Sequence, residues 1–275
     1  FFKCKLLYKY FFQKKWALIL LAMFFFFMEM KCSRTSPTNP EKEVDGKAWQ
    51  VVKSFPHDTL AFTQGLLVRD GFFYESTGLY GKSSLRKIKI STGEILQIQS
   101  LPANIFAEGL AFDGMNFVQL TWLNGIGYIY EPDSFSLKNT FAYKRQGWGI
   151  TYDGHFLIMS DGSDSLFYWD PISLIEIKAL GVTFDGVPIE HLNELEFIDN
   201  QIWANIWKSD SIAIINPGDG IVATWLDMSG ILSAGERTAT ADVMNGIAWD
   251  EITNAIFITG KLWPKVYQIQ LPESQ

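Results

Sequence analysis

The sequence predicts an all-β fold: a five-bladed β-propeller of four-stranded antiparallel blades, closed by pairing of its N- and C-terminal strands. Three observations support this prediction. Short β-patterned runs separated by turns rich in Gly, Asp and Asn begin at Trp49, without a long helical period. One pattern recurs five times at separations of 44, 40, 45 and 52 residues, a spacing typical of propeller blades. An alternating segment before the first unit can complete the last one.

Each unit begins with a short apolar strand that carries a glycine at a fixed position, replaced in the fourth unit by Glu194. The five strands read TQGLLV (63–68), AEGLAF (107–112), GWGITY (147–152), LNELEF (192–197) and MNGIAW (244–249). A tight turn follows each of them, such as RDG at 69–71 and FDG at 112–114. Asp-Gly pairs favour two-residue hairpins because both central residues accept positive φ.

The two ends of the folded part are predicted to meet in one blade. The fifth unit has room for only about three strands before Gln275. The segment AWQVVKSF, residues 48–55, alternates polar and apolar side chains and supplies the fourth strand. Such pairing leaves no free sheet edge, and the propeller is therefore predicted over residues 47–272.

The first 32 residues are interpreted as a signal peptide or N-terminal anchor. Five lysines up to Lys15 precede an apolar run of thirteen residues, 16–28, which is short for a membrane span and typical of a signal peptide. Residues 33–46 are polar, contain two prolines and are predicted to be a linker. Cys32 is placed like a lipidated cysteine, but the residues before it are not small. Export to the periplasm or the cell exterior is the prediction, with lipid anchoring the weaker alternative.

Composition excludes several classes of function. The net charge is −7 although the first 31 residues are basic, so the remainder is strongly acidic and unsuited to nucleic-acid binding. The only cysteines, Cys4 and Cys32, precede the folded part, which excludes thiol catalysis and thiolate metal sites. The three histidines are scattered, and there is no GxSxG motif. Any catalysis is therefore expected to use a carboxylate as acid and base.

Repeat geometry gathers distant residues at one mouth of the central channel. If the first strand of each unit is innermost, its head lies at one mouth, to which the antiparallel second strand returns. The five head residues are Gln64, Glu108, Trp148, Asn193 and Asn245. The residues expected beside them are Glu75, Trp122, Asp161, Trp207 and Lys261. The long loops 181–192 and 226–243 are expected to reach the same mouth as walls or lids.

Glu108 is the only carboxylate among the five heads, and we predict it to be catalytic. Neighbouring tryptophans would limit its solvation, raise its pKa and suit it to proton transfer near neutral pH. Lys261 is the second predicted catalytic residue, because it can pair with Glu108 or stabilise developing negative charge. The predicted substrate-binding residues are Phe62, Gln64, Trp122, Trp148, Trp207, Asn193 and Asn245. Each residue also has a structural alternative, such as an ion pair, turn hydrogen bonding or blade packing.

Eight phrases, in order between about residues 55 and 268, carry a family resemblance. They are FPHDTLAFTQGL, YESTGLYGKSSL, AEGLA with LTW, GWGITYDG, SDGSDSL, LNELEFIDNQIWANIW, NGIAW and TGKLWP. The chain resembles the plant and bacterial type of glutaminyl-peptide cyclotransferase, and not the zinc-dependent animal type. By motif, the functional positions of that family fall on Phe62, Gln64, Glu108, Trp122, Trp148, Trp207 and Lys261.

The resemblance implies a five-bladed propeller that cyclises the N-terminal glutamine of peptides or proteins to pyroglutamate and releases ammonia. No cofactor is required under this interpretation, although a structural Ca²⁺ in the central channel is compatible with it. We expect a monomer that contacts a membrane only through its N-terminal anchor.

Two alternatives stay open. Glu108, Asn193 and Asn245 also resemble the ligand set of a Ca²⁺-dependent, lactonase-like propeller hydrolase. The chain is otherwise an exported propeller that binds peptides or glycans without catalysis.

Overall fold

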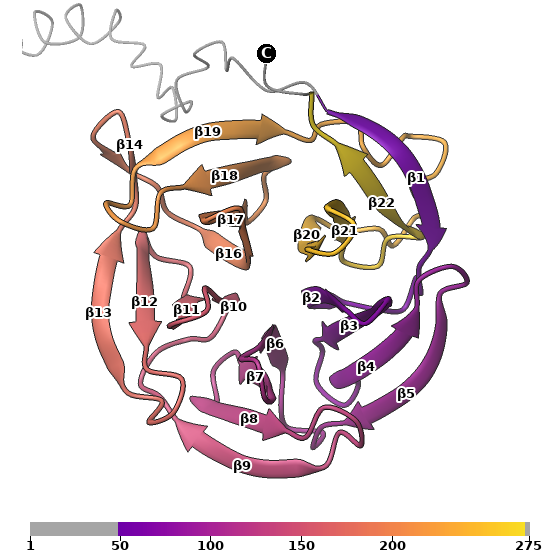
Figure 1. Ribbon diagram of the computed structural model, residues 1–275. Helices are drawn as coiled ribbons and strands as arrows, with labels where there is room; N and C mark the ends of the chain where they lie inside the picture. Colours follow the sequence, from indigo (N-terminus) through magenta and orange to yellow (C-terminus); the bar gives the residue numbers. More distant parts are fainter. Residues whose placement is uncertain (1–48, 273–275) are drawn as a thin grey trace, which may run out of the picture. The chain divides into compact units, whose positions relative to one another are not determined.

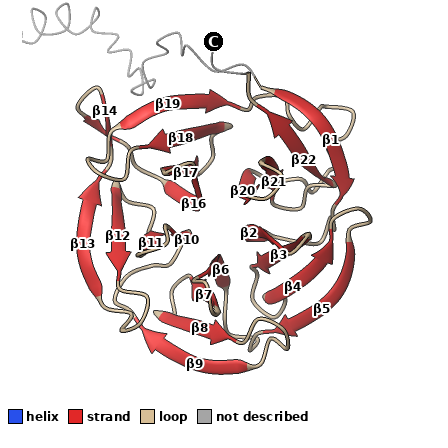
Figure 2. Cartoon of the chain, in the orientation of Figure 1, coloured by secondary structure: helices blue, strands red, loops and turns tan. Residues whose placement is uncertain are grey.

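The computed structural model describes residues 49–272, which contain strands and turns and no α-helix. Five four-stranded antiparallel sheets are arranged as blades around a central axis (Figure 1), and Figure 2 shows the same ring by secondary structure. The predicted five-bladed β-propeller is therefore confirmed. The predicted signal peptide (1–32), the linker (33–46) and Cys32 lie outside the described residues. Within residues 49–272, no helix is long and apolar enough to cross a membrane.

The blades follow one another along the chain. Blade 1 comprises β2 (Thr63–Arg69), β3 (Phe72–Thr77), β4 (Ser84–Lys89) and β5 (Glu94–Ser100). Blade 2 comprises β6 (Ala107–Phe112), β7 (Phe117–Thr121), β8 (Ile126–Tyr130) and β9 (Leu137–Ala142). Blade 3 comprises β10 (Ile150–Tyr152), β11 (Leu157–Ser160), β12 (Ser165–Trp169) and β13 (Glu176–Gly181). Blade 4 comprises β16 (Leu192–Ile198), β17 (Gln201–Ile206), β18 (Ser211–Ile215) and β19 (Val222–Asp227). Blade 5 comprises β20 (Met244–Asp250), β21 (Ala255–Gly260), β22 (Lys265–Gln270) and β1 (Gln50–Pro56).

The ring closes as the sequence predicts. Strand β1 pairs antiparallel with β22, with Phe55 opposite Val266, and forms the outer edge of blade 5. The predicted innermost strands, one per blade, face the axis as β2, β6, β10, β16 and β20 (Figure 1). The mouth at which these strands begin therefore collects the head of every unit.

Glycines in the innermost strands allow neighbouring blades to approach closely. A Cβ atom on Gly65 would lie 2.5 Å from the backbone nitrogen of Leu110, and one on Gly109 would lie 2.7 Å from that of Ile150. Glu194 occupies the equivalent position in blade 4, and its side chain extends across the channel to other blades. Its carboxylate accepts backbone N–H groups of blades 1 and 5, from Leu66 at 3.2 Å and Ile247 at 2.9 Å.

The predicted two-residue hairpins occur in only part of the repeat. Asp70 and Gly71 both take positive φ, at 52° and 76°, and the turn after β16 behaves likewise. The prediction is wrong at Asp113 and Asp153, where four residues separate the strands. Each of these aspartates accepts two backbone N–H groups of its own loop, at 2.6 to 2.8 Å. The aspartate side chain therefore satisfies backbone N–H groups of a longer turn, in which only the following glycine needs positive φ.

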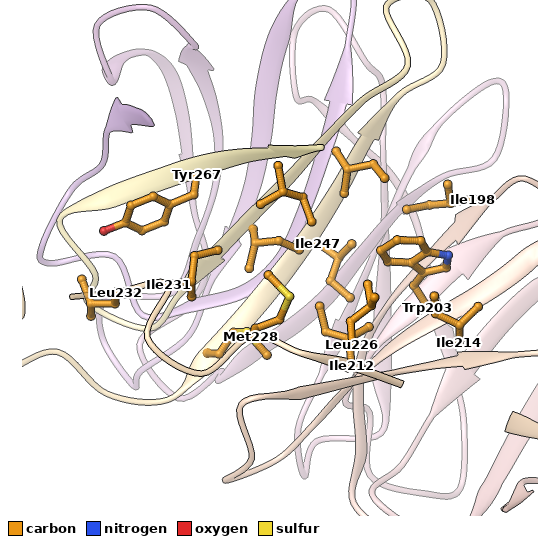
Figure 3. Close-up of a cluster of buried hydrophobic side chains, with 14 of the residues drawn as sticks. Ile198, Trp203, Ile212, Ile214, Leu226, Met228, Ile231, Leu232, Ile247 and Tyr267 are labelled. Atoms are coloured by element: carbon orange, nitrogen blue, oxygen red, sulfur yellow. The ribbon is translucent and has the colours of Figure 1, made fainter. Parts of the chain in front are cut away.

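The hydrophobic core lies between neighbouring blades. The cluster in Figure 3 joins Ile212 and Trp203 of blade 4 to Ile247 and Tyr267 of blade 5, with Met228 from the connecting loop between them. Burying one such side chain contributes roughly 1.5–3 kcal/mol. This core fixes the angle between blades and thereby the positions of the strand heads.

The two long loops, predicted to be walls or lids of the mouth, pack against the blades beside it. Residues 183–188 form the small hairpin β14 (Thr183–Phe184) and β15 (Val187–Pro188), and Phe184 packs against Trp225 of blade 4 at 5.8 Å. The loop after β19 buries Met228 in the core and then runs beside Lys261, whose backbone exchanges two hydrogen bonds with residues 242 and 243. These loops brace the mouth from the side.

Candidate active site

The heads of the innermost strands are irregular where the mouth begins. In four blades the pairing between the first and second strands slips at the head, which is a β-bulge. A bulge places an extra residue in one strand and turns its side chain away from the regular pleat. The residues at these bulges are Gln64, Glu108, Asn193 and Asn245. Trp148, the fifth head, precedes β10.

Polar groups of the second strands hold the bulged backbone in place. The Ser76 hydroxyl donates to the backbone oxygen of Glu108 in the next blade. The Ser160 hydroxyl donates to the backbone oxygen of Asn193 at 2.6 Å, and Asn205 Oδ1 accepts Gly246 N–H at 2.9 Å. The heads of blades 2, 4 and 5 are thus positioned by the blade beside them as well as by their own strands.

Glu108 presents a buried carboxyl group that makes no hydrogen bond or salt bridge with the described residues. The residue is 5% exposed, and within residues 49–272 no hydrogen bond or salt bridge reaches its carboxyl oxygens. Burial raises the pKa of Glu108 well above its ordinary value, against the opposing charge of Lys261. The site therefore holds a carboxyl group that takes up a proton more readily than an exposed glutamate does.

Lys261 lies at the end of β21, in the same mouth. Its ammonium is 4.9 Å from the centre of the Phe62 ring, and the residue is 5% exposed. Burial lowers the pKa of Lys261, and the charges of Glu108 and Asp242 oppose this shift. The next residue, Leu262, takes a φ of 61° and donates its N–H to Ala61 O at 2.8 Å. This turn anchors Lys261 to the segment that carries Phe62.

The amide heads are placed differently from one another. Asn245 donates its side-chain N–H to Thr63 O at 2.9 Å and to Gln64 Oε1 at 3.3 Å, so these two heads are in contact. The Oδ1 atom of Asn245 is buried and accepts no hydrogen bond from the described residues. Asn193 is also buried, and the contact that fixes it is through its backbone oxygen.

The three tryptophans form part of an aromatic arc. Trp148 packs edge to face on Trp207, with ring centres 5.5 Å apart. Trp122 packs on Phe106 at 5.6 Å, and Phe106 packs on Phe62 at 6.0 Å. All five rings are partly buried, so each keeps some surface accessible.

Gln146 joins the two halves of this arc. Its Oε1 atom accepts the indole N–H of Trp122 at 2.7 Å and that of Trp148 at 3.0 Å. One acceptor therefore fixes the orientation of two indole rings from different blades. Gly162 lies against the Trp148 ring, and a Cβ atom at this position would lie 2.7 Å from that ring.

Glu75 does not lie beside the mouth, and that prediction is wrong. The second strand of blade 1 continues to Thr77, so Gly78 occupies the expected place. Glu75 is fully buried and pairs with His57 at 2.9 Å, while Thr63 donates to the same carboxylate at 2.7 Å. The other ring nitrogen of His57 bonds the Trp263 backbone oxygen at 2.7 Å. The pair is therefore a buried link behind the site.

Asp161 is at the mouth but belongs to its own turn. It accepts Ser163 N–H at 3.0 Å and forms a salt bridge with Arg145 at 3.4 Å. Two cavities of about 590 and 670 Å³ lie elsewhere: one opens between blades 4 and 5, and the other occupies the opposite end of the channel. Within the described residues, no group of three or more His, Cys, Asp or Glu side chains is placed to hold a metal ion.

The sequence interpretation overlooked Phe106, Gln146 and His191. Each stands two residues before a head, as Phe62 stands before Gln64. Because the antiparallel pairing brings that position to the same mouth, the repeat alignment contains the signal that identifies all three. His191 packs on Trp207 at 5.9 Å and ends the arc on that side.

Comparisons with known proteins agree with this architecture. A sequence model of the glutamine cyclotransferase family matches residues 22–271. A glutaminyl-peptide cyclotransferase from Arabidopsis thaliana is 40% identical over 265 residues, covering 94% of this chain and 82% of the relative. The crystal structure of Myxococcus xanthus glutaminyl cyclase superposes with a TM-score of 0.77 at 36% identity, covering 82% of this chain and 97% of that one.

Proposed function

The chain belongs to the glutamine cyclotransferase family, and from this premise we propose that it cyclises the N-terminal glutamine of peptides or proteins to pyroglutamate, with Glu108 as the proton carrier. The observation that carries the mechanism is the carboxyl group of Glu108. It is buried, it has no hydrogen-bond partner among residues 49–272, and its pKa is raised.

The reaction is an intramolecular acyl transfer. The α-amine nitrogen of the substrate forms a bond to its own γ-carboxamide carbon, and the bond from that carbon to the amide nitrogen then breaks. The proton that the amine loses is taken by Glu108 and delivered to the leaving nitrogen, which departs as NH₃. The carboxylate is thereby restored, and no other reactant is consumed.

Lys261 and Gln64 are proposed to act on the oxygen of the scissile carboxamide. This oxygen gains negative charge in the tetrahedral intermediate, and a preorganised cation or N–H donor stabilises it most in a poorly solvated site. Lys261 is buried and held over Phe62, and it forms no salt bridge with residues 49–272, so its N–H groups are available to a ligand. Gln64 accepts from Asn245 through Oε1, which turns its own amide N–H₂ group toward other partners.

The aromatic arc is proposed to orient the glutamine side chain. A free glutamine side chain samples many rotamers, and the reaction needs the one that brings amine and carboxamide together. The rings of Phe62, Trp122, Trp148 and Trp207 are fixed by mutual contacts and by Gln146. A rigid apolar wall lowers the entropic cost of holding the folded substrate conformer.

Incubation with a glutamine-initiated peptide tests the proposal. Mass spectrometry should show the loss of one NH₃ from that peptide and none from asparagine- or alanine-initiated controls. An unchanged glutamine peptide after prolonged incubation with folded protein would exclude the activity. The same reaction after exhaustive dialysis against EDTA separates it from a Ca²⁺-dependent hydrolase, which would lose activity.

The remaining properties are proposals that rest on the sequence. We propose that the protein is exported, because a basic flank and an apolar run precede the propeller. We also propose that it works as a monomer without a required cofactor. Fractionation of the producing cells tests export, and sedimentation analysis tests the oligomeric state.

A further inference from the structure

We propose that the aromatic surface of Tyr80 and Phe106 binds the side chain of the residue that follows the N-terminal glutamine, and that it favours an apolar or aromatic residue there. The inference rests on the proposed cyclotransferase activity, because it places the second residue of the same substrate. It adds a specificity subsite at the outer edge of the aromatic arc, where Phe106 adjoins the pocket of the reacting glutamine and Tyr80 extends the aromatic surface toward solvent.

Phe106 lies at the centre of a cluster of four rings. Its ring centre is 6.0 Å from Phe62, 5.6 Å from Trp122 and 5.5 Å from Tyr80, all in edge-to-face geometry. Phe62 adjoins Lys261, whereas Tyr80 is 52% exposed. The cluster therefore forms an apolar path that begins beside the catalytic groups and ends in solvent.

The turn between β3 and β4 holds Tyr80 in this place. Leu79 takes a φ of 81°, a conformation that is unfavourable for an L-residue and persists only where the surroundings enforce it. The Ser83 hydroxyl donates to Leu79 O at 2.9 Å and accepts Ala107 N–H at 3.0 Å. Ser83 thus links the turn to Ala107, the residue next to Phe106. This link holds the exposed Tyr80 ring in a fixed position.

Gly78 allows the Phe106 ring to pack closely against the backbone after β3. A Cβ atom at Gly78 would lie 2.4 Å from Phe106 Cε1 and 3.1 Å from Gln64 Cγ. Without a side chain at this position, Phe106 packs down against the head of β2. The ring therefore adjoins the pocket of the reacting glutamine on one side and Tyr80 on the other.

The two sides of the mouth differ in polarity. On the blade 1 and blade 2 side, Leu60 and Leu123 are 74% and 58% exposed and stand next to the segments that carry Phe62 and Trp122. On the other side, the ammonium of Lys208 lies 4.2 Å over the Trp207 ring, and His191 packs on the same ring. Exposed apolar side chains gathered beside a binding site favour an apolar ligand group. The side chain of the substrate residue that follows the glutamine is accordingly assigned to the side of the mouth that carries Tyr80.

Chain geometry supports the assignment. One residue of extended peptide spans at most about 3.6 Å, so the residue after the glutamine lies within about one ring spacing of the reacting group. Phe106 is the ring at that spacing from Phe62, and Tyr80 is the next ring outward.

The test compares kcat/KM for peptides that begin Gln-Phe, Gln-Leu, Gln-Gly and Gln-Ser. Wild-type protein should prefer phenylalanine over glycine, and Tyr80→Ser should reduce the Phe-to-Gly ratio about fivefold to tenfold, mainly through KM. Tyr80→Phe should retain the ratio, because the ring and its contact with Phe106 survive. Ile172→Ser, which removes an apolar side chain that is 88% exposed on blade 3, serves as the matched control.

The outcomes separate the two proposals. If the wild-type protein cyclises all four peptides without preference, or if Tyr80→Ser lowers all four values equally, the subsite is wrong and the activity stands. If the folded wild-type protein releases ammonia from none of them, the proposed function itself is wrong.

Discussion

Lys261 and Glu108 are buried at the same mouth with opposite formal charges, yet no salt bridge within 4 Å joins them among the described residues. The ammonium of Lys261 lies over the Phe62 ring instead. Burial raises the pKa of Glu108 and lowers that of Lys261, so both groups are shifted toward neutrality. A direct ion pair would hold both in their charged forms and block them from substrate. The separation leaves each group available for the separate role that the proposed mechanism gives it.

The first prediction concerns the charge of Lys261. Because this charge lowers the pKa of Glu108, Lys261→Met should raise that pKa further. The account requires ionised Glu108, so activity should rise with pH through its pKa. The acid limb of the kcat profile should lie above pH 4.5 in the wild-type protein and at still higher pH in Lys261→Met, with kcat/KM lower by roughly 10²–10³. Lys208→Met, which removes an exposed lysine at the same mouth, should leave the limb in place. An acid limb at the same pH in Lys261→Met and wild type would argue against the coupling.

The second prediction uses two glycines of blade 3. Gly162 and Gly154 have φ values of 83° and 90°, so alanine should cost a similar backbone strain of about 1–2 kcal/mol at either position. Only at Gly162 does the new Cβ meet the Trp148 ring. Gly162→Ala should therefore lower kcat/KM about tenfold or more at matched stability, whereas Gly154→Ala should not. Thermal unfolding and steady-state kinetics of both variants check this, and equal activity losses would mean that the Trp148 position is immaterial.

The third prediction concerns the glutamine that bridges two tryptophans. Gln146→Leu removes the acceptor of both indole N–H groups, each hydrogen bond contributing about 0.5–1.5 kcal/mol. KM should rise roughly threefold to tenfold, with a smaller effect on kcat, because the proposed role of the rings is to orient substrate and not to transfer a proton. Gln146→Glu retains an acceptor oxygen and should stay close to wild type. A KM for Gln146→Leu equal to that of wild type contradicts the bridging role.

The fourth prediction concerns the buried pair His57 and Glu75. Burial alone lowers the pKa of His57, but the Glu75 carboxylate outweighs this and raises it. Burial alone raises the pKa of Glu75, but His57 outweighs this and lowers it. The contribution of His57 is complete below about pH 6.5 and is lost as pH rises through its folded pKa. That of Glu75 is complete above about pH 4.5 and is lost as pH falls. Stabilisation by the pair is therefore greatest between these values.

Chemical denaturation at pH 5.5 measures this contribution. Glu75→Gln should lower the free energy of unfolding by about 3–5 kcal/mol, since it leaves His57 buried without its partner. Glu236→Gln is the control: it breaks the partly exposed pair with Lys265 and should cost less than about 1 kcal/mol. Equal losses in the two variants would show that the His57–Glu75 link is no stronger than a surface pair.

The fold follows from the sequence because each blade repeats one local pattern. The glycine of each first strand, with Glu194 in its place in blade 4, marks where neighbouring blades approach, and the alternating segment near Gln50 marks the closing strand. These are periodic features, and periodicity is visible in a linear chain. The heads Gln64 and Glu108 are found for the same reason.

The contacts of individual side chains are not periodic, and they are therefore harder to predict from the sequence. The repeat pattern predicts Glu75 beside the mouth, but its strand runs on to Thr77. Only the pairing register reveals that its carboxylate turns inward to His57. Gln146 looks like any polar loop residue until Trp122 and Trp148 of two blades are seen to share it. Long-range partners of this kind depend on the closed ring.

The most direct test of the account is the activity of Glu108→Gln. Glutamine has the shape of the protonated carboxyl group and cannot carry the proton, and the raised pKa of Glu108 means that removing its charge should not destabilise the fold. The account predicts a folded protein with an unchanged or higher melting temperature and a kcat on glutamine-initiated peptides lower by roughly 10²–10⁴. A folded Glu108→Gln protein that releases ammonia at close to the wild-type rate would contradict it.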